Sequence, residues 1–333
     1  GDNMPNAWEY VWAFDPADPL DAMDDADADG YPNVYECVHD TDPRKATSAP
    51  DEGGLDPVPT PTIAVTTNGA HTIQSALDAA TNTYDIVRVS AGVYSITNDI
   101  DFHAGRTVLL LAGSGAQATV LDGGDSVRLI DFPSGVGPHT ALTGFTLQDG
   151  RAAEGGAIRC EGASPLISQC IVTNCHATAD GCGLFVSDGS PRVVNCTFAD
   201  NSADDDGGGV RSKSQSAPVF VDCVVSNNAA KHGGGMHWTS STGTVVNCVV
   251  SDNVAEKDGG GIYGRETDAS FDACLITRNL AKDDGGGIRC TNASPSFVAC
   301  VISANTAHDH GGGFYGNDSG ALLDGCLISG NTA

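Results

Sequence analysis

The sequence predicts an all-β solenoid in which coils of 26 residues stack along one axis. The first observation is a Gly-Gly-Gly triplet that recurs at a constant spacing of 26 residues, beginning at Gly207, Gly233, Gly259, Gly285 and Gly311. Degenerate versions keep this register at Gly155 and Gly181. A fixed period of this size indicates a repeat architecture, because one repeat cannot bury its apolar face alone and must stack on its neighbours.

The second observation is that each repeat places the same residue types at the same positions. Cysteines occupy one position in seven successive repeats: Cys170, Cys196, Cys223, Cys248, Cys274, Cys300 and Cys326. Two residues later comes an apolar file: Val172, Phe198, Val225, Val250, Ile276, Ile302 and Ile328. Short β-branched and aromatic pieces cut by Gly, Asn, Asp and Ser are typical of strands and turns. Twenty-six residues suit a coil of three short strands, with coils stacked about 4.8 Å apart.

The third observation is an asparagine file five residues after the cysteines: Asn201, Asn228, Asn253, Asn279, Asn305 and Asn331. Only the first repeat departs, with Cys175 at this position. We expect the amides to stack as a hydrogen-bonded ladder at a turn. The cysteine file is interpreted as small buried side chains, since residues one strand spacing apart lie further apart than a disulfide prefers. Cys175 and Cys182 flank one turn and are the best disulfide candidates in an extracellular setting.

The "GGGI…N-x-A" pattern resembles the repeats of polymorphic outer membrane proteins, and the chain resembles a right-handed parallel β-helix of the pectate-lyase-like kind. The resemblance covers roughly residues 60–333 and implies a single-stranded β-helix. "HTIQSALDAATNTYDIVRVSAGVY" resembles the entry cap of such folds, with a short amphipathic helix near residues 73–80. Strands are then expected at residues 86–89, 93–96, 107–111, 127–132 and 141–147. Lyases, hydrolases, adhesins and phage fibres share this fold, so it implies no single activity.

The N-terminal segment carries a calcium-binding motif. Residues 25–36, "DADADGYPNVYE", match D-x-D-x-D-G-x5-E. The expected ligands are the carboxylates of Asp25, Asp27 and Asp29, the backbone carbonyl of Tyr31, and Glu36, because a hard cation takes six or more oxygens. The flanking residues resemble thrombospondin type 3-like or dockerin-like segments of bacterial surface proteins; the alternative is an acidic disordered linker. The predicted divisions are a calcium-binding segment (1–43), a linker (44–60), cap and irregular coils (61–154) and seven regular coils (155–333).

A charged column precedes the glycines: Asp180, Asp206, His232, Asp258, Asp284 and His310. Carboxylates stacked at strand spacing repel one another unless a cation intervenes. Asp204, Asp206, Asp283 and Asp284 have few compensating charges nearby in the sequence and are candidates for a second calcium site between coils. The alternative is a charged corner that is simply solvated.

A basic and aromatic row follows the first inward apolar residue of each repeat: Arg159, Phe185, Arg211, His237, Tyr263, Arg289 and Tyr315. Strand alternation points this row outward. Such a face suits an anionic polysaccharide, and the resemblance to β-helix lyases implies an Arg or Lys as proton acceptor. If the chain is an enzyme, the candidate catalytic residues are Arg211, Lys213, His237, Tyr263 and Arg265. The alternative is a solvated β-face with charge and stacking pairs between coils.

Composition narrows the function. The formal net charge of −27 argues against nucleic acid as a partner, and no apolar run has the ~18 residues of a membrane span. The regular coils favour a secreted or cell-surface, calcium-binding structural or adhesive protein. We expect it to be a segment of a longer surface protein or a fibre that associates with itself, because the strand edges at a solenoid end invite another chain. The alternative function is a polysaccharide lyase or glycoside hydrolase acting on an anionic polysaccharide.

Overall fold

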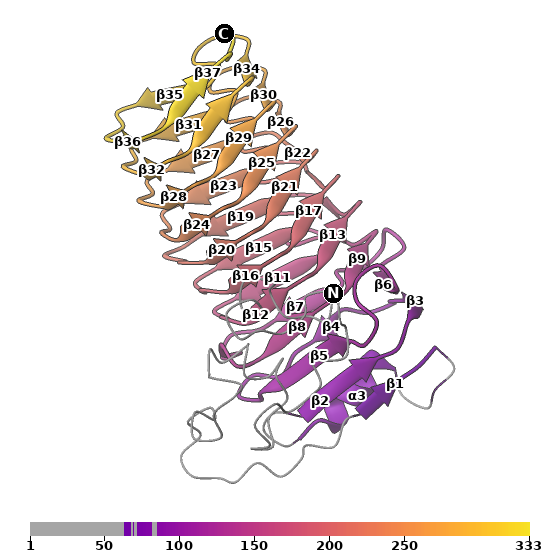
Figure 1. The fold of residues 1–333 in the computed structure, drawn as a ribbon. Coiled ribbons are helices and arrows are strands. Elements are labelled where there is room, and N and C mark those ends of the chain that lie inside the picture. Colours follow the sequence, from indigo (N-terminus) through magenta and orange to yellow (C-terminus); the bar gives the residue numbers. More distant parts are fainter. Residues whose placement is uncertain (1–62, 68, 70–71, 82–84) are drawn as a thin grey trace, which may run out of the picture.

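A computed structural model describes residues 63–67, 69, 72–81 and 85–333. These residues form a parallel β-solenoid whose coils stack from a cap that contains α3 to the C-terminal end (Figure 1). The predicted calcium-binding segment, including Asp25, Asp27, Asp29, Tyr31 and Glu36, and the predicted linker lie outside the described residues. Within the described part of the chain, no helix has the length and apolar character needed to cross a membrane.

The cap contains the one helix of the described residues, α3 (Ile73–Ala79). The Thr72 hydroxyl accepts a hydrogen bond from the Ser75 amide at 3.1 Å, which satisfies a free donor of the first turn. Ile73, Ala76 and Leu77 are buried, so the helix closes the end of the core. The early strands are β1 (Ile63–Val65), β2 (Asp85–Val89), β3 (Gly92–Ser95), β4 (Ile100–Asp101), β5 (Val108–Ala112), β6 (Thr119–Asp122) and β7 (Ile130–Phe132).

The later coils each add one strand to each of four parallel sheets. Sheet A continues from β1, β2 and β5 with β8 (Ala141–Thr143), β12 (Leu166–Ser168), β16 (Arg192–Val194), β20 (Val219–Val221), β24 (Thr244–Val246), β28 (Ser270–Asp272), β32 (Ser296–Val298) and β36 (Leu322–Asp324). Sheet B continues from β3 and β6 with β9 (Thr146–Gln148), β13 (Ile171–Thr173), β17 (Thr197–Ala199), β21 (Val224–Ser226), β25 (Val249–Ser251), β29 (Leu275–Thr277), β33 (Val301–Ser303) and β37 (Leu327–Ser329).

The other two sheets lie on either side of the glycine corner. Sheet C continues from β4 and β7 with β11 (Ile158–Glu161), β15 (Leu184–Ser187), β19 (Val210–Lys213), β23 (Met236–Thr239), β27 (Ile262–Arg265), β31 (Ile288–Thr291) and β35 (Phe314–Asn317). Sheet D comprises β10 (Arg151–Ala152), β14 (His176–Ala177), β18 (Ser202–Ala203), β22 (Ala229–Ala230), β26 (Val254–Ala255), β30 (Leu280–Ala281) and β34 (Thr306–Ala307).

Sheet D corrects the prediction of three strands per coil. Its strands are only two residues long and directly follow the asparagine file. After this turn the next two residues also pair with their counterparts in the adjacent coils, including β10 and β14, which follow Gly150 and Cys175 rather than asparagine. The other expected strands are present within a few residues of their predicted limits, and the expected strand at residues 141–147 is divided into β8 and β9.

The core consists of inward files that repeat from coil to coil. The cysteine file is buried, with Cys170 to Cys300 between 0 and 2% exposed. Large rings fill the interior of the middle coils: Phe220 meets Trp238 edge-on at 6.2 Å, and Phe271 stacks on Phe297 at 4.8 Å between ring centroids. Such burial of aromatic area supplies much of the stability of a fold without a globular centre.

The asparagine ladder is present as predicted. The Oδ1 atom of Asn253 accepts hydrogen bonds from the backbone N and the Nδ2 of Asn228 at 2.9 and 3.0 Å. Its own Nδ2 donates to the Val225 carbonyl at 2.9 Å. The same pattern links the coils from Asn201 to Asn331. Each amide therefore connects three coils, and the buried polar atoms of the asparagine side chains are satisfied.

The cysteine thiols donate hydrogen bonds to backbone carbonyls. The Cys248 Sγ, for example, donates to the Val246 carbonyl at 3.2 Å. The eleven cysteines of the described residues are free, and Cys175 and Cys182 are two buried thiols among them. The disulfide between these two residues stays a prediction. Burial raises the pKa of the Cys175 thiol to about 12, so it is protonated at neutral pH.

The glycine triplets are required by backbone geometry. The first glycine of each triplet has a left-handed φ, +67° at Gly259. The second lies against the next coil: a Cβ on Gly260 would stand 2.4 Å from the Gly286 carbonyl oxygen. The corner therefore excludes side chains for two separate reasons, conformation and close approach.

Candidate functional site

The basic row and the acidic column, which the sequence analysis treated separately, form one structure on the outer face of sheet C. Arg211, His237 and Tyr263 lie directly beside one another in the strand register. The glycine corner folds back over these strands: a Cβ on Gly207 would lie 3.1 Å from the Arg211 Cβ. This geometry brings each corner residue over the outward side chain that follows it by five positions. We call the result the charged corner, comprising Asp180, Asp206, His232, Asp258, Asp284, His310, Arg211, His237 and Arg289.

Arg211 lies between the acids of two successive coils. Its Nε is 3.7 Å from Asp180 Oδ2, and its Nη2 is 3.7 Å from Asp206 Oδ2. Nη1 donates to the Ser212 carbonyl and to the Thr239 hydroxyl, both at 3.1 Å. The side chain is only 7% exposed, and its Nε has no hydrogen-bond partner. The guanidinium thus lies between two carboxylates and is also hydrogen-bonded to Ser212 and Thr239 of the underlying strands.

His237 occupies the next coil. Its Nδ1 lies 3.1 Å from Asp206 Oδ2 without the geometry of a hydrogen bond, and its Nε2 is 3.1 Å from the Thr239 hydroxyl. The ring meets Tyr263 edge-on at 4.6 Å. Burial, reinforced by the charge of Arg211, lowers the pKa of His237 to about 4. The imidazole is therefore neutral at pH 7.

The arrangement recurs three coils beyond Arg211. Arg289 lies 4.0 Å from Asp258 Oδ1 and 3.9 Å from Asp284 Oδ2, and its guanidinium sits 4.3 Å from the centre of the Tyr315 ring. His310 Nδ1 is 2.9 Å from Asp284 Oδ1. Each arginine again serves the acid of its own coil and that of the preceding coil. Pairs of stacked carboxylates are thus separated by a cation along the rod.

The four residues of the predicted second calcium site have different surroundings and do not form one cluster. Asp206 and Asp284 take part in the charged corner. The Asp204 carboxylate is 61% exposed and lies 3.7 Å from His176 Nε2, and the Asp283 backbone amide donates to the Lys257 carbonyl. Among the residues that the structure describes, no group of three or more His, Cys, Asp or Glu side chains is arranged to hold a metal ion. The reason is that Arg and His occupy the places between the acids.

The five candidate catalytic residues lie on three neighbouring strands, β19, β23 and β27. Arg211 and His237 are buried. Lys213 Nζ bonds Glu154 at 3.0 Å and lies over the Phe185 ring at 4.6 Å. Arg265 is 57% exposed, and its Nε is 3.6 Å from Glu266. A general base must reach the proton it removes, so the two most central candidates are poorly placed for contact with a polymer outside.

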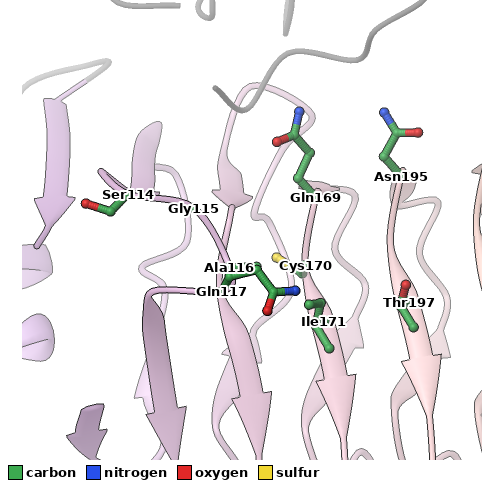
Figure 2. A pocket seen from close by; sticks show the side chains of 9 residues that line it. All are labelled: Ser114, Gly115, Ala116, Gln117, Gln169, Cys170, Ile171, Asn195 and Thr197. Atoms are coloured by element: carbon green, nitrogen blue, oxygen red, sulfur yellow. The ribbon is translucent and has the colours of Figure 1, made fainter. Parts of the chain in front are cut away.

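A separate cavity of about 310 Å³ lies outside sheet B (Figure 2). Its lining is Ser114, Gly115, Ala116, Gln117, Gln169, Cys170, Ile171, Asn195 and Thr197. The amides of Gln169 and Asn195 extend side by side from adjacent coils, and the loop carrying Gln117 forms the opposite wall. The lining contains no carboxylate and no basic side chain.

The sequence carries a signal for the charged corner in the spacing of its acidic and basic residues. Asp206 precedes Arg211 by five residues, and Asp284 precedes Arg289 by five. This recurring spacing places an acid and a base on the same corner of one coil. The distance in space could be known only from the tight turn at the glycines.

Comparison with known proteins supports the architecture. The family model described as "Right handed beta helix region" matches residues 139–276. The chain is a right-handed parallel β-helix. Solved structures with similar folds include the pectate lyase Pel9A, at 16% identity and a TM-score of 0.50 over 78% of this chain and 80% of that one. Others are ORF18 of Geobacillus virus E2 (15% identity, TM-score 0.34, 77% and 57% of the two chains) and a catalytic domain of a GH87 α-1,3-glucanase (10%, 0.33, 84% and 68%). No curated protein matches the sequence. The family match and the likeness to Pel9A support the fold of this β-helix and leave its activity open.

Proposed function

We propose that this β-helix is a structural or adhesive rod of an extracellular or cell-surface protein. The observation that carries the proposal is the state of the charged corner. The side chains best suited to chemistry on the outer face, Arg211 and His237, are buried and matched to Asp180 and Asp206. Arg211 and His237 are therefore engaged in contacts between successive coils, which suits a role in stability rather than in chemistry.

The continuity of the ladders supports the same function. The asparagine amides connect every coil from Asn201 to Asn331, and the aromatic contacts continue from Phe198 to Phe314. A solenoid of this kind resists bending, because each coil is bonded to its neighbours by the backbone and by side chains. A rod that displays or spaces other domains needs this property.

The proposal includes calcium at residues 25–36. Asp25, Asp27, Asp29, the Tyr31 carbonyl and Glu36 are oxygen ligands at the spacing a Ca²⁺ ion requires. The test is calorimetric titration of the full chain with Ca²⁺ beside its Glu36→Gln variant. We expect binding by the parent chain and a large loss of affinity in the variant; equal binding by both would contradict the assignment.

A polysaccharide-acting enzyme is the second candidate. It is favoured by the gathering of Lys213, Arg211, His237 and Tyr263 over three coils, on a fold that is also that of a pectate lyase. In this alternative the Glu154–Lys213 pair would open and Lys213, the more exposed cation at 29% side-chain exposure, would contact an anionic sugar.

One experiment separates the two functions. The full chain is incubated with polygalacturonate, alginate and α-1,3-glucan, with and without Ca²⁺, and both unsaturated products and new reducing ends are measured. We expect no turnover, together with rod-shaped particles in electron micrographs. Turnover that disappears in Lys213→Ala and persists in the matched control Lys282→Ala, whose residue is exposed outside the site, would establish the enzyme instead.

A further inference from the structure

The outer face of sheet A carries an apolar patch that the core does not use. Its residues alternate with inward ones: Leu109 and Leu111 flank the inward Leu110, and Leu166 precedes the inward Ile167. They form a cluster separate from the main core. We call it the sheet-A patch, comprising Ile86, Leu109, Leu111, Ala141, Leu166 and Val194.

These side chains are covered although they face out of the solenoid. Leu109 is 1% exposed and Leu166 is 9% exposed. Far along the same face, Val298 is 38% exposed and Asp272 is also exposed. Neighbouring strands of one sheet cannot cause this difference, because every interior strand has such neighbours. Among the described hydrophobic residues, the one that packs against the cluster is Val221, which is itself on the outer face of sheet A.

One of the two outward rows of the face changes in polarity along the rod in parallel with its burial. One outward row reads, from the cap onward, Ile86, Leu109, Ala141, Leu166, Arg192, Val219, Thr244, Ser270 and Ser296. This row is apolar in the coils nearest the cap and, except for Val219, polar in the later ones. The other outward row, which runs from Leu111 and Thr143 to Val246 and Val298, shows no such change in polarity, but its side chains also become more exposed along the rod. A partner over the first coils would produce burial that declines along both rows.

We propose that the sheet-A patch is the docking surface for residues 1–62 of the same chain. The described chain begins in β1, and Ile63 pairs with Val87, the direct neighbour of Ile86. Ile63, to which residues 1–62 are joined, therefore lies beside the patch. Tethering gives them an effective concentration in the millimolar range or above, which an untethered partner rarely reaches.

The contact within residues 1–62 is assigned to the aromatic residues Trp8, Tyr10, Trp12 and Phe14. They occupy every second position, so an extended segment would place all four on one side. Seven extended residues span about 20 Å, and the five strands from β2 to β16 span about 19 Å along the rod. Two of the three tryptophans of the protein lie in this segment, and an apolar surface is where indole rings gain most.

A second copy of the chain fits the patch less well. The patch lies where the chain enters the fold, so a tethered segment reaches it before a free molecule does. Two chains with a formal net charge of −27 each also repel one another at this distance.

The test is site-specific photo-crosslinking in the full chain. Leu166 or, as the matched control, Val298 is replaced by p-benzoylphenylalanine, and a mixture of ¹⁵N-labelled and unlabelled protein is irradiated. We expect Leu166 to give crosslinks within one chain to residues 1–62, and Val298 to give none to that segment. A Trp8→Ser/Trp12→Ser variant should lower the Leu166 crosslink by about tenfold or more, because buried indole rings dominate such contacts.

Three results would overturn the proposal. Crosslinks from Leu166 between labelled and unlabelled chains would identify a second copy as the occupant. Equal labelling from Leu166 and Val298 would show an open face. A Leu166 crosslink unchanged in the double tryptophan variant would exclude the aromatic segment. Far-ultraviolet circular dichroism of each variant confirms that the β-helix is intact before irradiation.

Discussion

The asparagine ladder and the charged corner lie at opposite ends of sheet D, and both stack like side chains along the rod. In the ladder, identical amides follow one another with bonds of 2.9–3.1 Å from Asn201 to Asn331. In the charged corner, acids alternate with Arg and His, and the contacts vary from 2.9 to 4.0 Å. An amide both donates and accepts, so it can stack on copies of itself. A carboxylate only accepts, so its stack needs a cation at nearly every step.

The largest effect is expected when an acid, as found in the charged corner, replaces one amide of the asparagine ladder. In Asn253→Asp, a fully buried carboxylate replaces an amide that donates to the Val225 carbonyl. A carboxylate buried without a cation raises its pKa by several units, so we expect a loss of about 4–6 kcal/mol in the free energy of unfolding at pH 7. Denaturant unfolding at pH 7 and pH 4.5 measures it, and the loss should shrink at the lower pH.

The control residue, Asn227, lies in the adjacent coil. Asn227 is exposed, and the equivalent positions in the adjacent coils are already Asp200 and Asp252. Asn227→Asp should therefore leave stability almost unchanged. Comparable losses in the two variants would show that burial is not what makes the amide necessary.

The ladder could be predicted from sequence, whereas for the charged corner the sequence shows only the five-residue spacing of acid and base. Recurrence of Asn at one position, with the apolar files around it, already fixes an inward turn, and an inward amide must find a partner. For Arg211, strand alternation predicted the outward direction correctly. Its side chain is only 7% exposed because the glycine corner folds back over β19. The repeat period in the sequence does not show how far the corner folds back. The calcium loop at residues 25–36 lies outside the described residues and stays a prediction.

Removing one cation from the charged corner is expected to have the next largest effect. Arg211→Leu would leave the Asp180 and Asp206 carboxylates facing one another, and breaking a buried ion pair in this way costs about 3–5 kcal/mol. Arg278→Leu is the matched control. Arg278 also pairs with an acid, Asp252, but on the exposed surface. Thermal unfolding should distinguish them clearly. A small effect of Arg211→Leu would mean that the acids are neutralised by other means.

Acid should weaken the charged corner more than the ladder. The pKa of His237 is about 4 in the folded protein and about 6.5 when unfolded, so the unfolded state takes up the proton first. Stability is thus full above pH 6.5 and is lost as the pH falls toward 4, by about 3 kcal/mol at most. His237→Gln, which cannot be protonated, should flatten the unfolding profile between pH 6.5 and 4. An unchanged slope in this variant would place the titration elsewhere.

The smallest effect is expected from a substitution that extends the asparagine ladder by one residue. Cys175 occupies the asparagine position in the first regular coil, and its backbone N already donates to Asn201 Oδ1 at 3.1 Å. The Gly150 amide donates to the Cys175 Sγ, a weak acceptor, at 3.3 Å. Cys175→Asn would replace this contact with an amide oxygen, so we expect a gain of about 0.5–1.5 kcal/mol in the free energy of unfolding. A loss would show that the smaller space left by the first coil, rather than its hydrogen bonds, selects cysteine there, and the ladder would then begin where packing allows it.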